Sequence, residues 1–456
     1  MSDEPKTLEP AATRPVSTPE PPAPTPDGGR AARWALVLVP IGLVLAALNL
    51  RPAITSLGAL LEEVSADLHM SGTVAGVLTS VPPLCFAAFG ITAPRLARRF
   101  GPAAVVCAGM AAICAGLLLR PFATGTAAFL AASALALMGI AVSNVLMPVI
   151  VKRYFPDRIG SMTGLYSMAL ALGTSLAAAL TVPMTDALGG DWRIGLGVWG
   201  ALAALAVLPW LPLLRDRTGA ARTERGAPAG GSAPASGSVP ASGSAPAGGS
   251  VPAAGSAPAA GAAARPMVRS RTAWALACFF GLQATGAYIT MGWMPQIFRD
   301  AGVPASTAGV LLAVTMVMGV PLAFVIPRLA TRMRNQAPIV IALGSCGLVG
   351  YTGLFLAPAG GAWAWAVLLG ISNCAFPLAL TMIGMRSRTG AGVVRLSAFA
   401  QSVGYLISIP GPLLVGVLYQ HSGGWGVPIA LMGGLMVPQM IVGSLAGRDR
   451  TIEDES

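Results

Sequence analysis

The run WALVLVPIGLVLAALNLRPAITSLGALL extends from Trp34 to Leu61 and carries a single charged residue, Arg51. A mostly apolar stretch of about 20 residues is long enough to cross a bilayer as an α-helix. We therefore expect a transmembrane helix with a guanidinium group inside it. Because an unpaired cation in hydrocarbon is costly, an ionisable side chain at this depth indicates a functional site. The group that would offset the cost is an anion or a polar solute.

Eleven further apolar runs make this an all-α polytopic membrane protein with twelve predicted transmembrane helices. Apolar residues are 54% of the 456 residues and charged residues only 10%, against about 25% charged in soluble domains. The six cysteines lie in apolar segments without metal-ligand spacing, so we expect no metal and no cofactor. The expected spans are 33–57, 71–93, 103–120, 125–150, 160–183 and 192–214 in the first half, and 272–297, 305–327, 338–357, 361–384, 393–418 and 425–446 in the second.

Polar segments divide the chain into two halves and orient it. We expect a disordered cytoplasmic tail at 1–32, a six-helix bundle at 33–214, a disordered Gly/Ser/Ala/Pro linker at 215–270, a second six-helix bundle at 271–446 and a cytoplasmic tail at 447–456. The net charge of +11 comes from basic clusters in alternate loops, which is a topology signal rather than a nucleic-acid surface. Both termini are therefore predicted to be cytoplasmic. The opposite loops hold only three basic residues, Arg120, Arg193 and Arg299.

An internal repeat relates the two halves at an offset of 233 residues. The segment 75–78, Ala-Gly-Val-Leu, recurs at 308–311, and Pro-Arg-Leu-Ala at 94–97 recurs at 327–330. Asp67 matches Asp300 at the same offset. Two like-oriented halves joined by a long linker are typical of a transporter whose binding site lies at the bilayer midplane between them.

The chain resembles the major facilitator superfamily, and within it the cyanate and 2-nitroimidazole permease branch (CynX/NimT-like). The similar stretches are Asn49-Leu50-Arg51-Pro52-Ala53, residues 93–101 (APRLARRFG), residues 152–158 (KRYFPDR), Phe279-Phe280-Gly281-Leu282-Gln283, Gly292-Trp293-Met294-Pro295 and residues 396–405 (LSAFAQSVGY). The resemblance implies the major facilitator fold, a small polar or anionic substrate, and a cavity lined by spans one, four, seven and ten, with five, eight and eleven beside them.

Arg51 is the first candidate for substrate binding, because its planar guanidinium suits two-point recognition of carboxylate-like or nitro-like oxygens. Pro52 predicts a kink beside it. Polar side chains on the spans that the resemblance places around the cavity complete the set, and basic residues after spans two and eight are candidates for gating loops. The substrate-binding candidates are Arg51, Asn49, Asn144, Tyr166, Gln283, Tyr288, Trp293, Asn373, Gln401 and Tyr405, and the gating candidates are Arg95, Arg98, Arg99, Arg328 and Arg332.

The function that these patterns predict is secondary active transport of a small anionic or neutral polar solute, such as a cyanate-like ion, a nitro compound or a small carboxylate. The expected setting is the cytoplasmic membrane, as a monomer in lipid, with a proton as a candidate co-transported or exchanged ion. The main alternative is a broad-specificity efflux pump for neutral compounds. A cationic-drug antiporter is disfavoured because no span contains a carboxylate, and a membrane-embedded enzyme is remote because no catalytic set occurs in any span.

Overall fold

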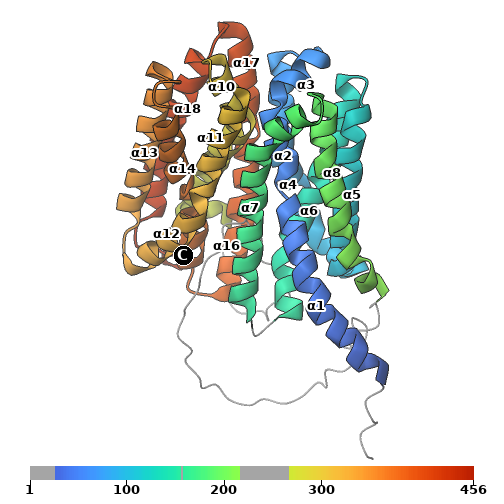
Figure 1. Cartoon of the computed structure of the whole chain (residues 1–456). Helices are drawn as coiled ribbons and strands as arrows, with labels where there is room; N and C mark the ends of the chain where they lie inside the picture. Colours follow the sequence, from blue (N-terminus) through green and yellow to red (C-terminus); the bar gives the residue numbers. More distant parts are fainter. Residues whose placement is uncertain (1–25, 156–157, 216–266, 456) are drawn as a thin grey trace, which may run out of the picture.

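A computed structural model describes residues 26–155, 158–215 and 267–455. Among these residues, twelve helical spans are long and apolar enough to cross a membrane, as the sequence predicts. Figure 1 shows the helices in chain order. The first half comprises α1 (Pro26–Asn49), α2 (Pro52–Ala59), α3 (Leu61–Asp67), α4 (Gly72–Phe100), α5 (Pro102–Leu119), η1 (Arg120–Phe122), α6 (Thr126–Tyr154), α7 (Ile159–Ala187), α8 (Trp192–Val207), η3 (Leu208–Trp210) and η4 (Pro212–Arg215).

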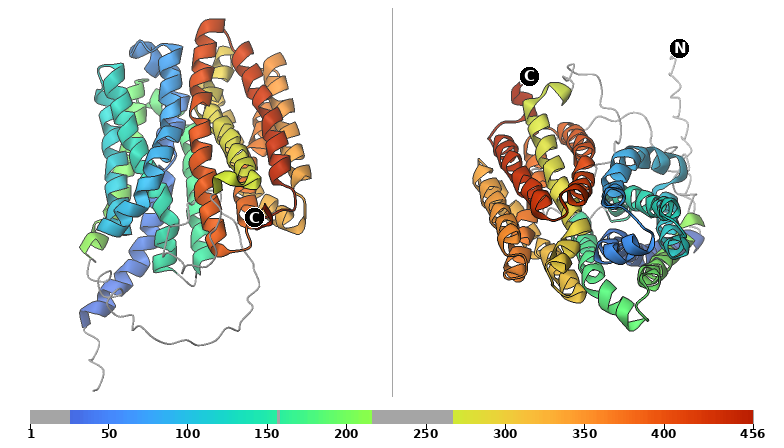
Figure 2. Two further views of the ribbon diagram at one scale, coloured as in Figure 1. Left: turned by 180° about the vertical axis from the view of Figure 1, so that it is seen from behind. Right: turned by 90° about the horizontal axis from the view of Figure 1, so that it is seen from above.

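The second half has the same number of spans. It comprises η5 (Met267–Arg269), α10 (Arg271–Asp300), α11 (Ala305–Val317), α12 (Gly319–Arg332), α13 (Ala337–Leu356), α14 (Ala362–Asn373), α15 (Ala375–Met385), α16 (Gly390–Ser408), α17 (Pro410–Ser422), α18 (Gly426–Ala446) and η6 (Ile452–Glu455). The two halves form separate bundles that stand side by side, as the view along the helices in Figure 2 shows. We call the end where α1 begins and α18 ends the linker side, and the opposite end, which carries α3, the far side (Figure 1).

Several spans are interrupted near mid-height. The first span breaks at Leu50 and Arg51, between α1 and α2, and Pro52 is the first residue of α2. Proline suits that position because it has no N–H to leave unsatisfied and its φ is already helical. Similar interruptions separate α11 from α12 at Met318, and α14 from α15 at Cys374. Broken helices are tolerated at membrane depth where they are buried in protein or line a cavity.

The bundles touch closely in the far half of the membrane. A Cβ atom on Gly58 of α2 would lie 2.1 Å from the Met291 carbonyl oxygen of α10, and one on Gly309 of α11 would lie 2.4 Å from the Ala178 carbonyl oxygen of α7. A Cβ on Gly416 of α17 would be 2.2 Å from the Gly72 carbonyl oxygen. Each contact joins one bundle to the other, so glycine is what allows the far side to close.

The segment 447–455, for which the sequence predicts a tail, packs on the linker side of the second bundle. The Glu455 carboxylate accepts hydrogen bonds from the Ser270 hydroxyl at 2.7 Å and the Thr272 hydroxyl at 2.6 Å, at the start of α10. Partial burial raises the pKa of Glu455, but the bonds from Thr272 and Ser270 outweigh it and hold the pKa below its usual value. The end of the described chain is therefore fixed to the second bundle.

Candidate functional site

A cavity of about 150 Å³ lies between the two bundles, from mid-height toward the linker side. Its walls come from the break before α2, from α7 in the first bundle, and from α10, α12, α15 and α16 in the second. Gly164 and Gly319 on its walls have no atom within 4 Å of a Cβ position, in contrast to the glycines of the far half. The bundles are therefore apart where the cavity lies and in contact beyond it.

Arg51 is the one cation of this cavity. Its side chain is half-buried, and among the described residues it forms no ion pair with a carboxylate. The guanidinium instead interacts electrostatically with the hydroxyl groups of Tyr288 and Tyr405, which line the cavity with it. A guanidinium that faces phenols and an open space keeps donors available for a bound oxyanion.

Aromatic rings from both bundles hold these two tyrosines. The Phe86 ring of α4 stacks on Tyr405, with centroids 5.2 Å apart, and lies 6.5 Å from Tyr288. Phe280 contacts Tyr405 edge to face at 5.2 Å. Packing of this kind restricts the rotamers of both phenols, so the hydroxyls beside Arg51 are held in place.

Asn373, at the break between α14 and α15, is a second polar group of the cavity. Its side-chain oxygen accepts a hydrogen bond from Gln283 Nε2 at 2.8 Å, and the Gln283 side-chain oxygen accepts one from Gln439 Nε2 at 2.9 Å. Gln283 does not line the cavity itself, but its hydrogen bond orients the Asn373 side chain. Because its oxygen is occupied, Asn373 has its amide NH₂ group left to donate to a solute.

The other five sequence candidates do not line the cavity. Asn49 is fully buried and donates to the carbonyl oxygens of Leu45 and Leu202, which joins α1 to α8. Trp293 packs against the Trp425 ring at 5.8 Å in the far half. The remaining three are buried: Asn144 and Tyr166, which are 5% and 2% exposed, and Gln401, which donates to the Ser397 hydroxyl at 2.7 Å.

Two hydroxyl groups of α7 belong to the cavity and were not among the sequence candidates. Ser167 and Thr174 both line it, on the face of α7 that also carries Leu170 and Ala171. Thr174 donates to the Leu170 carbonyl oxygen at 2.7 Å, whereas the Ser167 hydroxyl has no protein partner. Their seven-residue spacing is about two helical turns and places both hydroxyls on one face of the helix. This spacing was the feature of the sequence that could have identified them.

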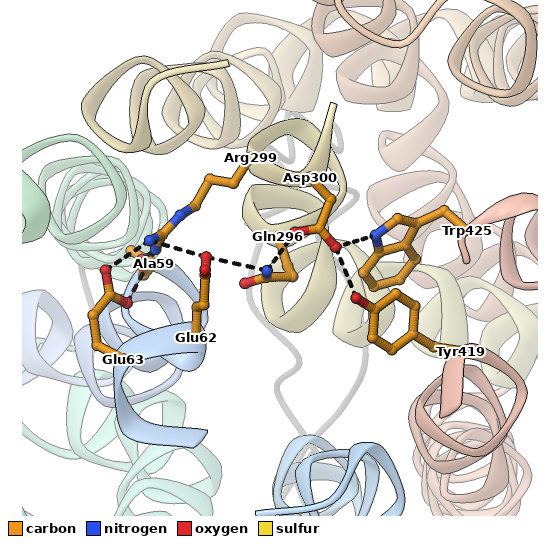
Figure 3. A network of polar contacts seen from close by, with 8 residues as sticks. All are labelled: Ala59, Glu62, Glu63, Gln296, Arg299, Asp300, Tyr419 and Trp425. Carbon is orange, nitrogen blue, oxygen red and sulfur yellow. Dashed lines mark hydrogen bonds and ion pairs between the residues drawn. The ribbon is translucent and has the colours of Figure 1, made fainter. Parts of the chain in front are cut away.

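A polar cluster joins the bundles on the far side, as Figure 3 shows. Arg299 of α10 donates to both carboxylate oxygens of Glu63, at 2.8 and 3.0 Å, and pairs with Glu62 at 3.0 Å. Asp300 accepts hydrogen bonds from the side chains of Tyr419 and Trp425 at 2.9 and 2.7 Å. We call these residues, with Gln296, the far-side cluster. Its ion pairs connect α3 to α10 and therefore hold the far side closed.

The five basic gating candidates lie on the linker side. Arg95, Arg98 and Arg99 are exposed at the end of α4, and Arg328 and Arg332 are exposed at the end of α12. None of them forms an ion pair within the part of the chain that the structure describes. The linker side thus has no counterpart of the far-side cluster among these residues.

Comparison with known proteins agrees with this architecture. The sequence profile of the Major Facilitator Superfamily matches residues 41–407. The chain is 35% identical to the uncharacterized transporter YycB of Bacillus subtilis (strain 168) over 90% of this chain and 94% of that protein. It is 30% identical to the 2-nitroimidazole transporter of Escherichia coli (strain K12), covering 90% and 95%, and 27% identical to the cyanate transport protein CynX of the same strain, covering 87% and 94%.

Solved structures share the fold at low sequence identity. The nucleoside transporter NupG superposes with a TM-score of 0.67 at 12% identity, covering 90% of this chain and 98% of that one. A bacterial homologue of the lysosomal transporter Spinster, in an inward-facing and occupied conformation, gives a TM-score of 0.64 at 15% identity, covering 91% and 93%. The profile match and the full-length relatives show that the chain is a multi-pass membrane protein of the Major Facilitator Superfamily, in the branch of the cyanate and 2-nitroimidazole transporters.

Proposed function

We propose that this protein is a secondary active transporter that moves a small anion or a small polar solute across the cytoplasmic membrane by alternating access. The observation that carries the proposal is Arg51, a guanidinium without a carboxylate partner in a cavity between the two bundles. A bound anion would supply the missing counter-charge, and the hydroxyls of Tyr288 and Tyr405 would complete its hydrogen bonds.

The asymmetry of the two sides supports an alternating mechanism. The far side is closed by glycine contacts and by the far-side cluster, whereas the cavity occupies the linker half. Because basic loops favour the cytoplasm, we assign the linker side to the cytoplasm and the far side to the exterior. This arrangement then corresponds to the state that exchanges solute with the cytoplasm.

The relatives narrow the class of solute. Two of them are a cyanate transport protein and a 2-nitroimidazole transporter. A linear anion carries an electronegative acceptor atom at each end, and a nitro group carries two, so a guanidinium can donate hydrogen bonds to either. We infer that the substrate of this chain is a small planar or linear molecule with such a group.

A carrier of neutral compounds is the second candidate, because much of the cavity wall is apolar. Met168, Met316, Phe324 and Phe376 line it alongside the polar groups. Apolar walls suit an uncharged solute, and flexible methionines suit broad specificity. The two candidates differ in what they require of Arg51, which an anion needs and a neutral solute does not.

Thermal stabilisation of the purified chain distinguishes these candidates, because a ligand of the native state raises its melting temperature. We would compare cyanate with its neutral isostere cyanamide, and acetate with acetamide, at constant ionic strength, and include nitrate and 2-nitroimidazole. The proposal expects saturable stabilisation by at least one small anion and a weaker effect of its neutral isostere. Stabilisation by the neutral compounds alone would favour the second candidate and contradict the first.

A further inference from the structure

Arg120 is a second guanidinium buried in the membrane-spanning region. Its place at the end of an apolar run predicts an outer loop, but the turn η1 directs its side chain inward, where it is 0% exposed. Its Nε donates to the Ser133 hydroxyl at 3.0 Å and its Nη1 donates to the Ala53 carbonyl oxygen at 2.9 Å. Both partners belong to the first bundle, so Arg120 is fixed to that bundle.

The hydrogen-bonding capacity of Arg120 is only partly used. Its Nη2 atom is buried and has no hydrogen-bond partner, and no carboxylate pairs with the side chain among the described residues. The Phe129 ring also faces the charge, with its centroid 5.6 Å from Cζ. A buried cation with an unsatisfied donor destabilises a fold unless a ligand supplies the missing partner.

A small cavity of about 10 Å³ adjoins Arg120 in the far half. This volume is enough for about one water molecule. Arg120, Gly58 and Thr79 line it from the first bundle, and Tyr288 and Gly292 line it from the second. The small cavity is therefore a space that the two bundles close around, at the same contact where Gly58 meets Met291.

Tyr288 lines both the small cavity and the large cavity that contains Arg51. Tyr288 thus belongs to two cavities, each of which has one guanidinium group on its wall. If the bundles separate on the far side, α10 withdraws from α2 and α4 while Arg120 stays with its partners on the first bundle. The small cavity would then widen into a space open to the far side, with Nη2 of Arg120 on its wall.

We propose that Arg120 is the cation of a second anion-binding site, which forms on the far side of Tyr288 when the bundles separate there. Its ligand is a small monovalent anion of the same class that Arg51 binds. The inference rests on the proposed function, because it extends the path of the same solute. Arg51 binds the anion in the state whose linker half is open, and Arg120 binds it in the state whose far half is open.

The test needs a chain whose far side is held open, which Gly58→Ala is expected to provide because the added Cβ clashes with the Met291 carbonyl oxygen. Dissociation constants for sodium cyanate and sodium nitrate would be measured by thermal stabilisation at constant ionic strength. In the Gly58→Ala chain, Arg120→Met is expected to raise the dissociation constant about tenfold or more, through loss of a charge-assisted hydrogen bond. Arg120→Lys, which keeps the charge, is expected to restore most of the affinity.

Two controls separate binding from a structural role. Thr181→Val removes the acceptor of the Trp199 Nε1 hydrogen bond inside the first bundle and does not touch Arg120, so it is expected to lower the melting temperature without changing the dissociation constant. Gly309→Ala, whose Cβ would clash with the Ala178 carbonyl oxygen, provides a second background should Gly58→Ala not fold.

The proposal is overturned if neither anion binds the opened chains, or if Arg120→Met leaves their affinity unchanged. Failure of the proposed function would give a different result. The Arg51→Gln variant, with the wild-type glycines, would then bind the anions as well as the parent chain does.

Discussion

Arg51→Gln is expected to weaken the binding of small anions by about two orders of magnitude, which is the usual effect of removing one partner of a buried charge pair. Glutamine retains an amide hydrogen-bond donor, on a shorter side chain, but carries no charge. Binding of a neutral isostere should therefore change only a few-fold. Isothermal titration of the purified variants with cyanate and cyanamide would measure both dissociation constants directly.

Two further variants make this result specific. Arg51→Lys keeps the positive charge but loses the planar, two-point geometry of the guanidinium, so an intermediate affinity is expected. Arg95→Gln removes an exposed arginine at the end of α4 and should leave the affinity unchanged. Equal losses for cyanate and cyanamide in Arg51→Gln would show that the residue shapes the cavity and does not select for charge.

Gly58→Ala is expected to shift the protein toward the state with an open far side. A Cβ at this position would lie 2.1 Å from the Met291 carbonyl oxygen, and overpacking of this kind costs about 1–3 kcal/mol in the closed state. The state with an open far side lacks that contact, so the added Cβ does not destabilise it. In a background without the six native cysteines, a cysteine at Leu57 should react about tenfold faster with an impermeant thiol reagent added from the far side.

Matched glycines provide the controls for this prediction. A Cβ on Gly173 would lie 2.2 Å from the Leu48 carbonyl oxygen, an equal clash inside the first bundle, so Gly173→Ala should lower stability without changing labelling. Gly286 of α10 has open space around its Cβ position, so Gly286→Ala should change neither the stability nor the labelling rate. If all three variants label at the rate of the parent, the far-half glycine contacts do not govern access.

The far-side cluster should contribute less to closure than the glycine contacts. Glu62 and Glu63 have side chains 48% and 32% exposed, so water and salt screen their pairing with Arg299. We expect Arg299→Gln to raise the labelling rate of the Leu57 cysteine in the same direction as Gly58→Ala but by a smaller factor.

The class of fold follows from hydropathy and the internal repeat. Twelve apolar runs of membrane-spanning length predict the twelve helical spans, and the 233-residue offset predicts two equivalent bundles. The repeat also has a structural meaning that the sequence does not reveal. Gly76 and Gly309 occupy equivalent positions in it, and both lie at contacts between the bundles. Gly58 and Met291, which touch each other, are separated by the same offset.

The site is harder to predict because polarity alone does not separate a cavity wall from a contact between helices. The amide NH₂ groups of Asn49 and Gln283 donate hydrogen bonds within the protein, whereas Tyr288 and Asn373 line the cavity, yet all four are polar residues in apolar spans. Arg120 lies at the end of an apolar run, where a loop position is the simpler expectation. Its inward turn depends on Ser133 and Ala53, which are distant in sequence.

The location of a bound anion tests the central claim most directly. Selenocyanate is a linear monoanion whose selenium gives an anomalous diffraction signal in crystals of the full chain. We expect an anomalous peak between the bundles, within about 6 Å of the Arg51 guanidinium, since the anion's near end would lie at hydrogen-bonding distance. A peak only at the exposed arginines of the linker side, or none at a saturating concentration, would contradict the assignment of Arg51 as the anion-binding residue.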